Sequence, residues 1–286
     1  MHNAIKSIDH PVIAVHSLEA ARGVYERLGF TVPPRGSHVE WGTGNWCIMF
    51  PEDYLELRGI IDPARFTLDL DRHLAEHGEG MMGLAFGTTT ADAAFEQMRA
   101  SGVAAKAVRA LARNFELPEG WVQPRFRLCF PEPAGVEGLM HVVVCEHLTP
   151  ELIRRPEYLV HANGVAGVLG MVGVIEDAER VQAVQRRLLG ADAVERAGGD
   201  LRLTLPSGQV IELLSPATFT QRYGRFWPDL GRRRSVLPVL RLRVADIDAT
   251  ARCLAAAAVA HRRDAERLMV GPRETCGVLF QMEMQS

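Results

Sequence analysis

The feature that most constrains the fold is a weak internal repeat, in which a strand, a helix, a small-residue stop and several further strands follow one another four times. Each unit opens with a short run of apolar and β-branched residues, which is typical of a buried strand. These opening runs are residues 11–15, 81–86, 165–175 and 237–244. Apolar residues then recur at helical spacing, and the first three predicted helices stop at Gly29, Gly102 and Gly190. This order predicts an α+β architecture with mixed sheets.

The length of the chain sets the number of domains. With 286 residues and 47 % hydrophobic content, two domains or one large duplicated domain are expected, and a disordered or disulfide-built chain is not. A short predicted helix that begins at Thr149 leads to a turn-like segment at 161–164. We place the boundary there, which gives a first domain at 1–148, a connector at 149–163 and a second domain at 164–286.

Charge and cysteine content limit the partners. The formal net charge is −3, and the arginine run at 232–234 is too short for a nucleic-acid footprint, so neither nucleic acid nor a membrane is an expected partner. The first residues lack the apolar segment of a secretory signal, and no run of about 18 apolar residues indicates a transmembrane helix. Five widely spaced cysteines favour reduced thiols. We expect a cytoplasmic protein that acts on a small molecule, with a homodimer as a possible assembly.

Several segments resemble the vicinal oxygen chelate superfamily, which includes glyoxalases, bleomycin-resistance proteins and dioxygenases. Those of the first unit are residues 8–15 (IDHPVIAV), 25–30 (YERLGF) and 54–57 (YLEL), although Ser17 stands where the family usually has aspartate. Those that resemble the glyoxalase-like branch are residues 38–45 (HVEWGTGN), 145–152 (CEHLTPEL) and 161–164 (HANG). The resemblance implies four βαβββ modules that pair into two cup-shaped, mixed-sheet domains.

His10 and Glu56 are the candidate metal ligands of the first cup. The resemblance implies that both side chains point into the cup and hold one divalent ion. An imidazole and a carboxylate suit Zn, Mn, Fe, Ni or Co. Strand alternation places Glu56 on the face opposite Leu55 and Leu57. A solvated outer face would also explain this glutamate, and a backbone bond at a strand end would explain His10.

A third ligand has to come from elsewhere, because Met82 and Gly83 occupy the position of the second unit that matches His10. We choose His147, just past the last predicted strand of that unit, with His141 as the second choice. Two histidines and one carboxylate leave coordination positions open for a substrate. Alternatively, His147 only precedes the cap of the next helix.

The candidate substrate-binding residues are His38, Trp41, Asn45 and Arg58. Trp41 offers an apolar wall and an N–H donor, and Asn45 offers both a donor and an acceptor. Arg58 shares a face with Glu56 and could pair with it or bind a substrate carboxylate. A tight turn with Trp41 over the core explains the same loop, and a solvated surface arginine explains Arg58. No catalytic residue is assigned.

The second half repeats a glutamate without a histidine. Glu212 echoes Glu56, but Gly170 and Val239 stand near the positions that match His10. We therefore expect the second domain to have a degenerate site and to be structural, a dimerisation surface or a metal-free binding cup.

The resemblance favours a metal-dependent enzyme of the glyoxalase-like type, a lyase or an isomerase. One divalent ion would bind the neighbouring oxygens of a small substrate while a nearby base moves a proton. One alternative is a non-catalytic binding protein of the bleomycin-resistance type. Another is an extradiol-type dioxygenase, which is less favoured because the matching second-unit histidine is absent.

Overall fold

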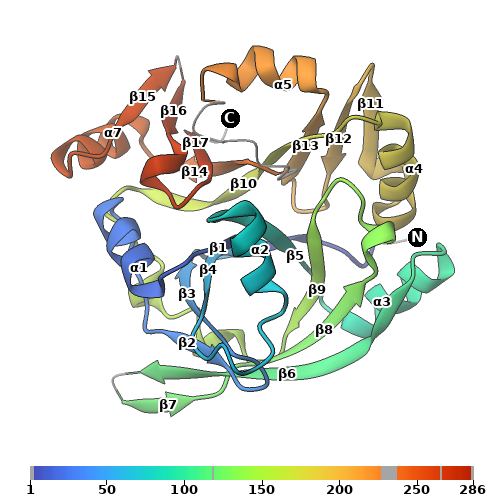
Figure 1. Cartoon of the computed structure of the whole chain (residues 1–286), viewed down its shortest axis with the longest axis horizontal. Coiled ribbons are helices and arrows are strands. Elements are labelled where there is room, and N and C mark those ends of the chain that lie inside the picture. Colours follow the sequence, from blue (N-terminus) through green and yellow to red (C-terminus); the bar gives the residue numbers. More distant parts are fainter. Residues whose placement is uncertain (1–2, 118, 227–236, 265, 285–286) are drawn as a thin grey trace.

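The computed structural model describes residues 3–117, 119–226, 237–264 and 266–284, in which four modules follow one another (Figure 1). The arginine run at 232–234 lies outside the described residues. The first module contains β1 (Ser7–Ala14), α1 (Leu18–Arg27), β2 (Gly36–His38), β3 (Thr43–Met49) and β4 (Tyr54–Ile60). After α2 (Leu70–His77), the second contains β5 (Gly80–Gly87), α3 (Ala91–Ala100), β6 (Ala105–Leu117), β7 (Gly120–Val122), β8 (Arg125–Pro131) and β9 (His141–His147).

The second half repeats this order. The third module contains β10 (Val165–Val174), α4 (Ala178–Leu189), β11 (Val194–Ala197), β12 (Asp200–Thr204) and β13 (Val210–Leu214), and α5 (Pro216–Tyr223) follows. The fourth contains β14 (Val239–Val244), α7 (Ile247–Ala256), β15 (His261–Asp264), β16 (Arg267–Val270) and β17 (Leu279–Glu283). The predicted α+β fold of four βαβββ modules is confirmed, with β7 as an addition to the second module.

The modules pair in sequence order within the chain. The first joins the second through the antiparallel β1–β5 pair, and the third joins the fourth through β10–β14. The resulting sheets have the orders β2-β3-β4-β1-β5-β9-β8-β6-β7 and β11-β12-β13-β10-β14-β17-β16-β15. In the first sheet β2 also pairs with the long strand β6, which runs along the lower edge of Figure 1. The first sheet therefore closes into a barrel, whereas the second stays an open cup.

Capping residues and glycines set the ends of the helices, as α1 shows. The hydroxyl of Ser17 accepts a hydrogen bond from the backbone N–H of Ala20 and caps α1, and Gly29 follows the helix with a φ of 86°. The buried Tyr25 of α1 packs edge-on against Phe280 of β17, with ring centroids 6.0 Å apart. This helix therefore connects the barrel to the second sheet. No helix in the described part of the chain is both long and apolar enough to cross a bilayer.

Successive side chains of a strand point to opposite faces of the sheet, so β4 contributes to two different apolar clusters. Leu55 and Leu57 of β4 belong to the large core that both halves share. Tyr54 of the same strand belongs to a second cluster inside the barrel, together with Cys47, Met49, Phe115, Phe126 and Cys145. The interior of the barrel is thus largely apolar, and its polar side chains are exceptions that require partners.

One side chain of the second half joins the two sheets directly. Gln209 accepts a hydrogen bond from the backbone N–H of Ile8 at 2.7 Å, and it donates to the backbone oxygen of Val168 at 3.0 Å and to Asp53 at 3.2 Å. The chain passes from one sheet to the other between β9 and β10. The domain division at residues 148 and 164 stays a prediction.

Candidate functional site

The candidate site lies inside the first barrel, where β1 brings two adjacent polar residues together. Ile8 pairs with Phe86 and His10 pairs with Ala85, so that Asp9 is the extra residue of a β-bulge. Neighbouring residues of a regular strand face opposite sides. Here Oδ2 of Asp9 instead accepts a hydrogen bond from Nδ1 of His10 at 2.7 Å, and both side chains are buried.

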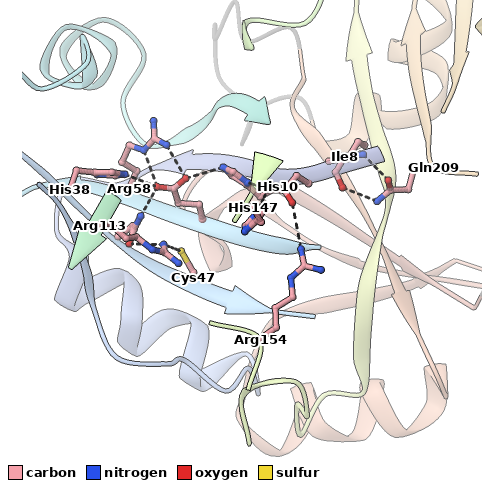
Figure 2. Close-up of polar contacts among 12 residues, drawn as sticks. Ile8, His10, His38, Cys47, Arg58, Arg113, His147, Arg154 and Gln209 are labelled. Atoms are coloured by element: carbon pink, nitrogen blue, oxygen red, sulfur yellow. Dashed lines mark hydrogen bonds and ion pairs between the residues drawn. The ribbon is translucent and has the colours of Figure 1, made fainter. Parts of the chain in front are cut away.

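Glu56 on β4 is surrounded by four hydrogen-bond donors, which belong to Asn45, Arg58 and His10. Figure 2 labels Arg58 and His10 of this group. Its Oε1 accepts from Nδ2 of Asn45 at 2.8 Å and from Nε of Arg58 at 3.0 Å. Its Oε2 accepts from Nη2 of Arg58 at 2.8 Å and lies 3.2 Å from Nε2 of His10. A carboxylate offers about four lone-pair sites, so side chains of the barrel occupy all of them.

Asp9 is shared by two histidines and an arginine. Its Oδ2 also accepts from Nε2 of His147 at 2.9 Å, and its Oδ1 accepts from Nη2 of Arg154 at 3.4 Å. An ionised carboxylate can only accept, so a neutral His147 ring carries its proton on Nε2. Nδ1 of His147 is then a bare nitrogen, and it is buried without a hydrogen-bond partner among the described residues.

The protonation states follow from these contacts. Burial lowers the pKa of His10, but its hydrogen bonds to Asp9 and Glu56 outweigh that effect and raise it. Burial raises the pKa of Glu56, but the Arg58 guanidinium and His10 hold it well below its usual range. Burial also opposes ionisation of Asp9, whose pKa His147 and His10 nevertheless hold below its usual range. His10 therefore lies as an imidazolium between two carboxylates.

A second guanidinium, that of Arg113 on β6, is only 4 % exposed. Its Nη1 donates to Oδ1 of Asn45 at 3.2 Å and contacts Sγ of Cys47 at 2.7 Å, while its Nε and Nη2 have no hydrogen-bond partner among the described residues. The site thus holds more cations than carboxylates. The cations are His10, Arg58, Arg113 and Arg154, and the carboxylates are Asp9 and Glu56. Such a surplus favours an anionic ligand.

The predicted substrate-binding residues gather around one carboxylate. Asn45 and Arg58 bond to Glu56, and Nε2 of His38 lies 4.0 Å from Oε1 of that residue. Trp41 packs against the His38 ring, with ring centroids 5.2 Å apart. Burial lowers the pKa of His38 to about 4, helped by Arg58, so His38 is neutral at physiological pH.

Sequence reasoning missed Asp9, Arg113 and Arg154. The position of Asp9 depends on a bulge that no local pattern announces. A usable signal existed for Arg113, because it alternates with Phe115 and Leu117, and all three are buried on β6. Arg154 follows β9 in the connector and reaches Asp9 from there.

A family model described as a glyoxalase-like domain matches residues 8–189, which contain almost all of the barrel and the start of the third module. The chain belongs to the glyoxalase-like domain family. No curated protein matches this glyoxalase-like chain.

Solved structures share the fold of the glyoxalase-like chain over nearly its whole length. A hypothetical protein from Staphylococcus aureus is 12 % identical with a TM-score of 0.70, covering 97 % of this chain and 99 % of that one. A mutant of 4-hydroxymandelate synthase from Streptomyces coelicolor is 12 % identical with a TM-score of 0.59, covering 99 % and 94 %. A xylose isomerase-like TIM barrel/4-hydroxyphenylpyruvate dioxygenase fusion protein is 12 % identical with a TM-score of 0.58, covering 99 % and 49 %. These likenesses concern the fold, and with the family match they confirm the predicted superfamily.

The resemblance implies a divalent ion on His10 and Glu56, and His147 is the predicted third ligand. The hydrogen-bond donors around these three residues test whether they can hold a cation. Nε2 of His10 and Oε2 of Glu56 are 3.2 Å apart, a spacing that two ligands of one ion can have. However, Glu56 already accepts four hydrogen bonds, two of them from a guanidinium, and like charges repel at this range. His147 bonds to Asp9 instead, and His141 is exposed at the start of β9. As arranged here, these residues do not fit a cation, and the ligand set stays a prediction.

One group of described residues does place three ligand atoms within 4.8 Å of one another, namely those of Asp9, Cys145 and His147. A carboxylate, a thiolate and an imidazole form a donor set that zinc accepts. Burial raises the pKa of Cys145 well above its usual range, so binding of an ion by this group would have to release the thiol proton.

The glutamate of the second half occupies the equivalent place in its own sheet. Val12 pairs with Glu56 between β1 and β4, and Val172 pairs with Glu212 between β10 and β13. Glu212 accepts from Nη1 of Arg222 at 3.1 Å, and its side chain is 18 % exposed. The degenerate site expected in this half stays a prediction.

Proposed function

We propose that the first barrel is the active site of a glyoxalase-like enzyme that moves a proton on a small substrate with neighbouring oxygens, as a lyase or an isomerase. The observation that carries this proposal is the bare, buried Nδ1 of His147, whose Nε2 is held by Asp9 at 2.9 Å. A carboxylate that fixes one ring nitrogen sets the tautomer and leaves the other nitrogen as a general base.

In the proposed step Nδ1 of His147 takes a proton from the carbon next to a carbonyl group. The electrons of the broken C–H bond move to the carbonyl oxygen, which becomes an enolate oxyanion. Asp9 stabilises the imidazolium that forms, as an orienting carboxylate does in a catalytic triad. With a 2-hydroxy ketone, the hydroxyl proton passes to the enolate oxygen, the imidazolium returns its proton to the former carbonyl carbon, and a new C=O bond forms at the neighbouring carbon, which completes an isomerisation. With a leaving group on the carbon beta to the carbonyl, the enolate expels it, the C=O bond re-forms and the imidazolium gives its proton to the leaving group, which completes an elimination.

The charge and the walls of the barrel support this assignment. The surplus of cations over carboxylates stabilises a developing oxyanion, and such electrostatic stabilisation often contributes more to the rate than any other effect. The His147 ring packs against Phe126 and Tyr54, with centroids 5.1 and 6.1 Å away. These apolar walls exclude water from the base and strengthen each electrostatic interaction.

A non-catalytic binding protein of the bleomycin-resistance type is the second candidate, which the apolar lining of the barrel favours. We also propose a cytoplasmic location, which the free cysteines suit. A homodimer is a further proposal, in which the second domain would supply the contact surface.

Deuterium exchange tests the proposal directly. The protein is incubated in D2O with dihydroxyacetone, hydroxyacetone or 2-oxobutanoate, and loss of the C–H signal next to the carbonyl is followed by proton NMR. We expect the protein to catalyse exchange of one of these probes, and His147→Gln to slow it by roughly 10²–10⁴-fold, the usual contribution of a general base. The matched control is His16→Gln, since His16 is exposed at the end of β1.

Equal exchange rates in the protein and in His147→Gln would remove His147 from the mechanism. Binding of these probes without any exchange would favour the binding-protein candidate over the enzyme.

A further inference from the structure

Arg113 has one edge of its guanidinium fixed by the barrel and the other edge unused. Nη1 donates to Asn45 at 3.2 Å and contacts Cys47 at 2.7 Å, which fixes the plane of the group. Nε and Nη2 are buried and have no hydrogen-bond partner among the described residues. A buried donor without an acceptor is unfavourable, and a buried charge without a countercharge is more so.

The unused atoms form the edge that binds carboxylates. Nε and one terminal nitrogen of a guanidinium donate two parallel hydrogen bonds to the two oxygens of a carboxylate. Arg58 shows this geometry within the same barrel, because its Nε and Nη2 bond to the two oxygens of Glu56 at 3.0 and 2.8 Å. Arg113 presents the same pair of atoms with no carboxylate on them.

Among the described residues no carboxylate forms an ion pair with Arg113, although Glu56 acts on it from a longer distance. The rings of Phe115 and Phe126 lie 5.8 and 5.7 Å from its guanidinium carbon. Burial raises the pKa of Cys47 to about 11, against the opposing effect of Arg113, so the thiol is neutral. The carboxylate of Glu56 is already taken up by Arg58, Asn45 and His10.

We propose that the Nε–Nη2 edge of Arg113 binds the carboxylate group of a small organic acid inside the first barrel. The inference rests on the proposed function in one respect, namely that this acid is the substrate on which His147 acts. The position fits, because the ring of Phe126 contacts both the Arg113 guanidinium and the His147 ring. Phe126 therefore lies beside both the proposed anchor and the proposed base, so an acid held by Arg113 is near His147.

Entry of the acid requires one ring to move, because the two nitrogens are covered in this structure. Phe126 is the ring that we expect to move, since it is 9 % exposed whereas Phe115 is 2 % exposed. Phe126→Ala is therefore expected to speed association of a carboxylate without removing its anchor.

The test compares matched probes by isothermal titration calorimetry and thermal shift. The carboxylates are propionate and 2-oxobutanoate, the neutral analogues are propionamide and 2-oxobutanamide, and the inorganic anion is sulfate. The protein should bind the carboxylates at least tenfold more tightly than the amides and than sulfate. Arg113→Met should lose this preference, and Arg113→Lys should weaken it at least tenfold because a lysine cannot bind both oxygens in parallel.

The controls separate this inference from the proposed function. Arg109→Met removes an exposed arginine of the same strand and should leave carboxylate binding unchanged. His147→Gln should also still bind carboxylates, so binding without proton exchange would support the anchor and reject the base. Equal affinity for carboxylates and amides, equal stabilisation by sulfate, or unchanged carboxylate binding in a folded Arg113→Met or Arg113→Lys would overturn the proposal.

Discussion

Glu56→Gln is expected to destabilise the fold, which a pure metal-ligand role for Glu56 would not require. The carboxylate accepts hydrogen bonds from Asn45, from Arg58 twice and from His10, at 2.8 to 3.2 Å, and its side chain is 3 % exposed. The amide removes the negative charge that two buried cations share, and it turns an N–H group towards one of the four donors. Breaking a buried ion pair by removing one partner costs about 3–5 kcal/mol.

Chemical denaturation followed by circular dichroism measures this loss, and a double-mutant cycle assigns its cause. Arg58→Met alone leaves the Glu56 carboxylate without the guanidinium that pairs with it. The double variant Glu56→Gln/Arg58→Met removes both charges, so neither is left unpaired. We expect the double variant to lose about 2 kcal/mol less than the two single variants together, as interacting buried charges do. Thermal midpoints should fall by about 2–4 °C for each kcal/mol lost.

Glu212→Gln is the matched control, because Glu212 holds the equivalent position in the open second sheet. Its side chain is 18 % exposed, so that variant should lose no more than about 1 kcal/mol. A Glu56→Gln protein within about 0.5 kcal/mol of the parent, or strictly additive losses in the cycle, would refute the interpretation of Glu56 as the centre of a buried ion network.

Three further predictions concern the rest of the molecule. Burial raises the pKa of Asp53 from 3.8 to about 7, so the protonated form is favoured in the fold. The stability that this proton contributes is complete below about pH 3.8 and is lost as the pH rises from there through 7. From pH 6 to 8 the loss should be about 1.4 kcal/mol, with no such slope in Asp53→Asn, as measured by urea denaturation at each pH. Gly36→Ala should lower the thermal midpoint, because the added Cβ would lie 2.3 Å from Oδ1 of Asn45. Gly23→Ala is the control in α1, where the added Cβ meets nothing within 4 Å, and it should raise the free energy of unfolding by about 0.5–1 kcal/mol. Dialysis against EDTA should change neither the thermal midpoint nor proton exchange, and a drop that added zinc reverses would favour the metal hypothesis.

The fold could be predicted because its signals are local. Helix stops at glycine and apolar runs of strand length recur from unit to unit, so the order of elements follows from the sequence alone. The closure of the first sheet could not be predicted, because β2 is only three residues long and its partner residues Arg113 and Phe115 lie far along the chain. Pairing between distant short segments depends on the finished fold.

The same division applies to the candidate site. His10, Glu56 and Arg58 carry motif or alternation signals within single strands, and the structure brings these three together. The sequence predicts His147 as a metal ligand, but its contact with Asp9 depends on the β-bulge in β1. A role that depends on a bulge cannot be deduced from strand alternation.

The two halves of the chain differ more in the length of one strand than in their residue types. In the first half β6 has 13 residues, whereas β15, its counterpart in the second half, has four. At about 3.3 Å per residue these strands span roughly 40 and 13 Å, so only the first can extend beyond its sheet and pair with β2. That pairing buries Glu56 and Arg113 in one closed interior, whereas Glu212 stays partly exposed beside Arg222. Equivalent glutamates therefore acquire different environments, and within the described residues the buried, unsatisfied guanidinium of Arg113 belongs to the sheet that closes. If the proposed chemistry exists in this chain, variants of the first barrel should abolish it and Glu212→Gln should not.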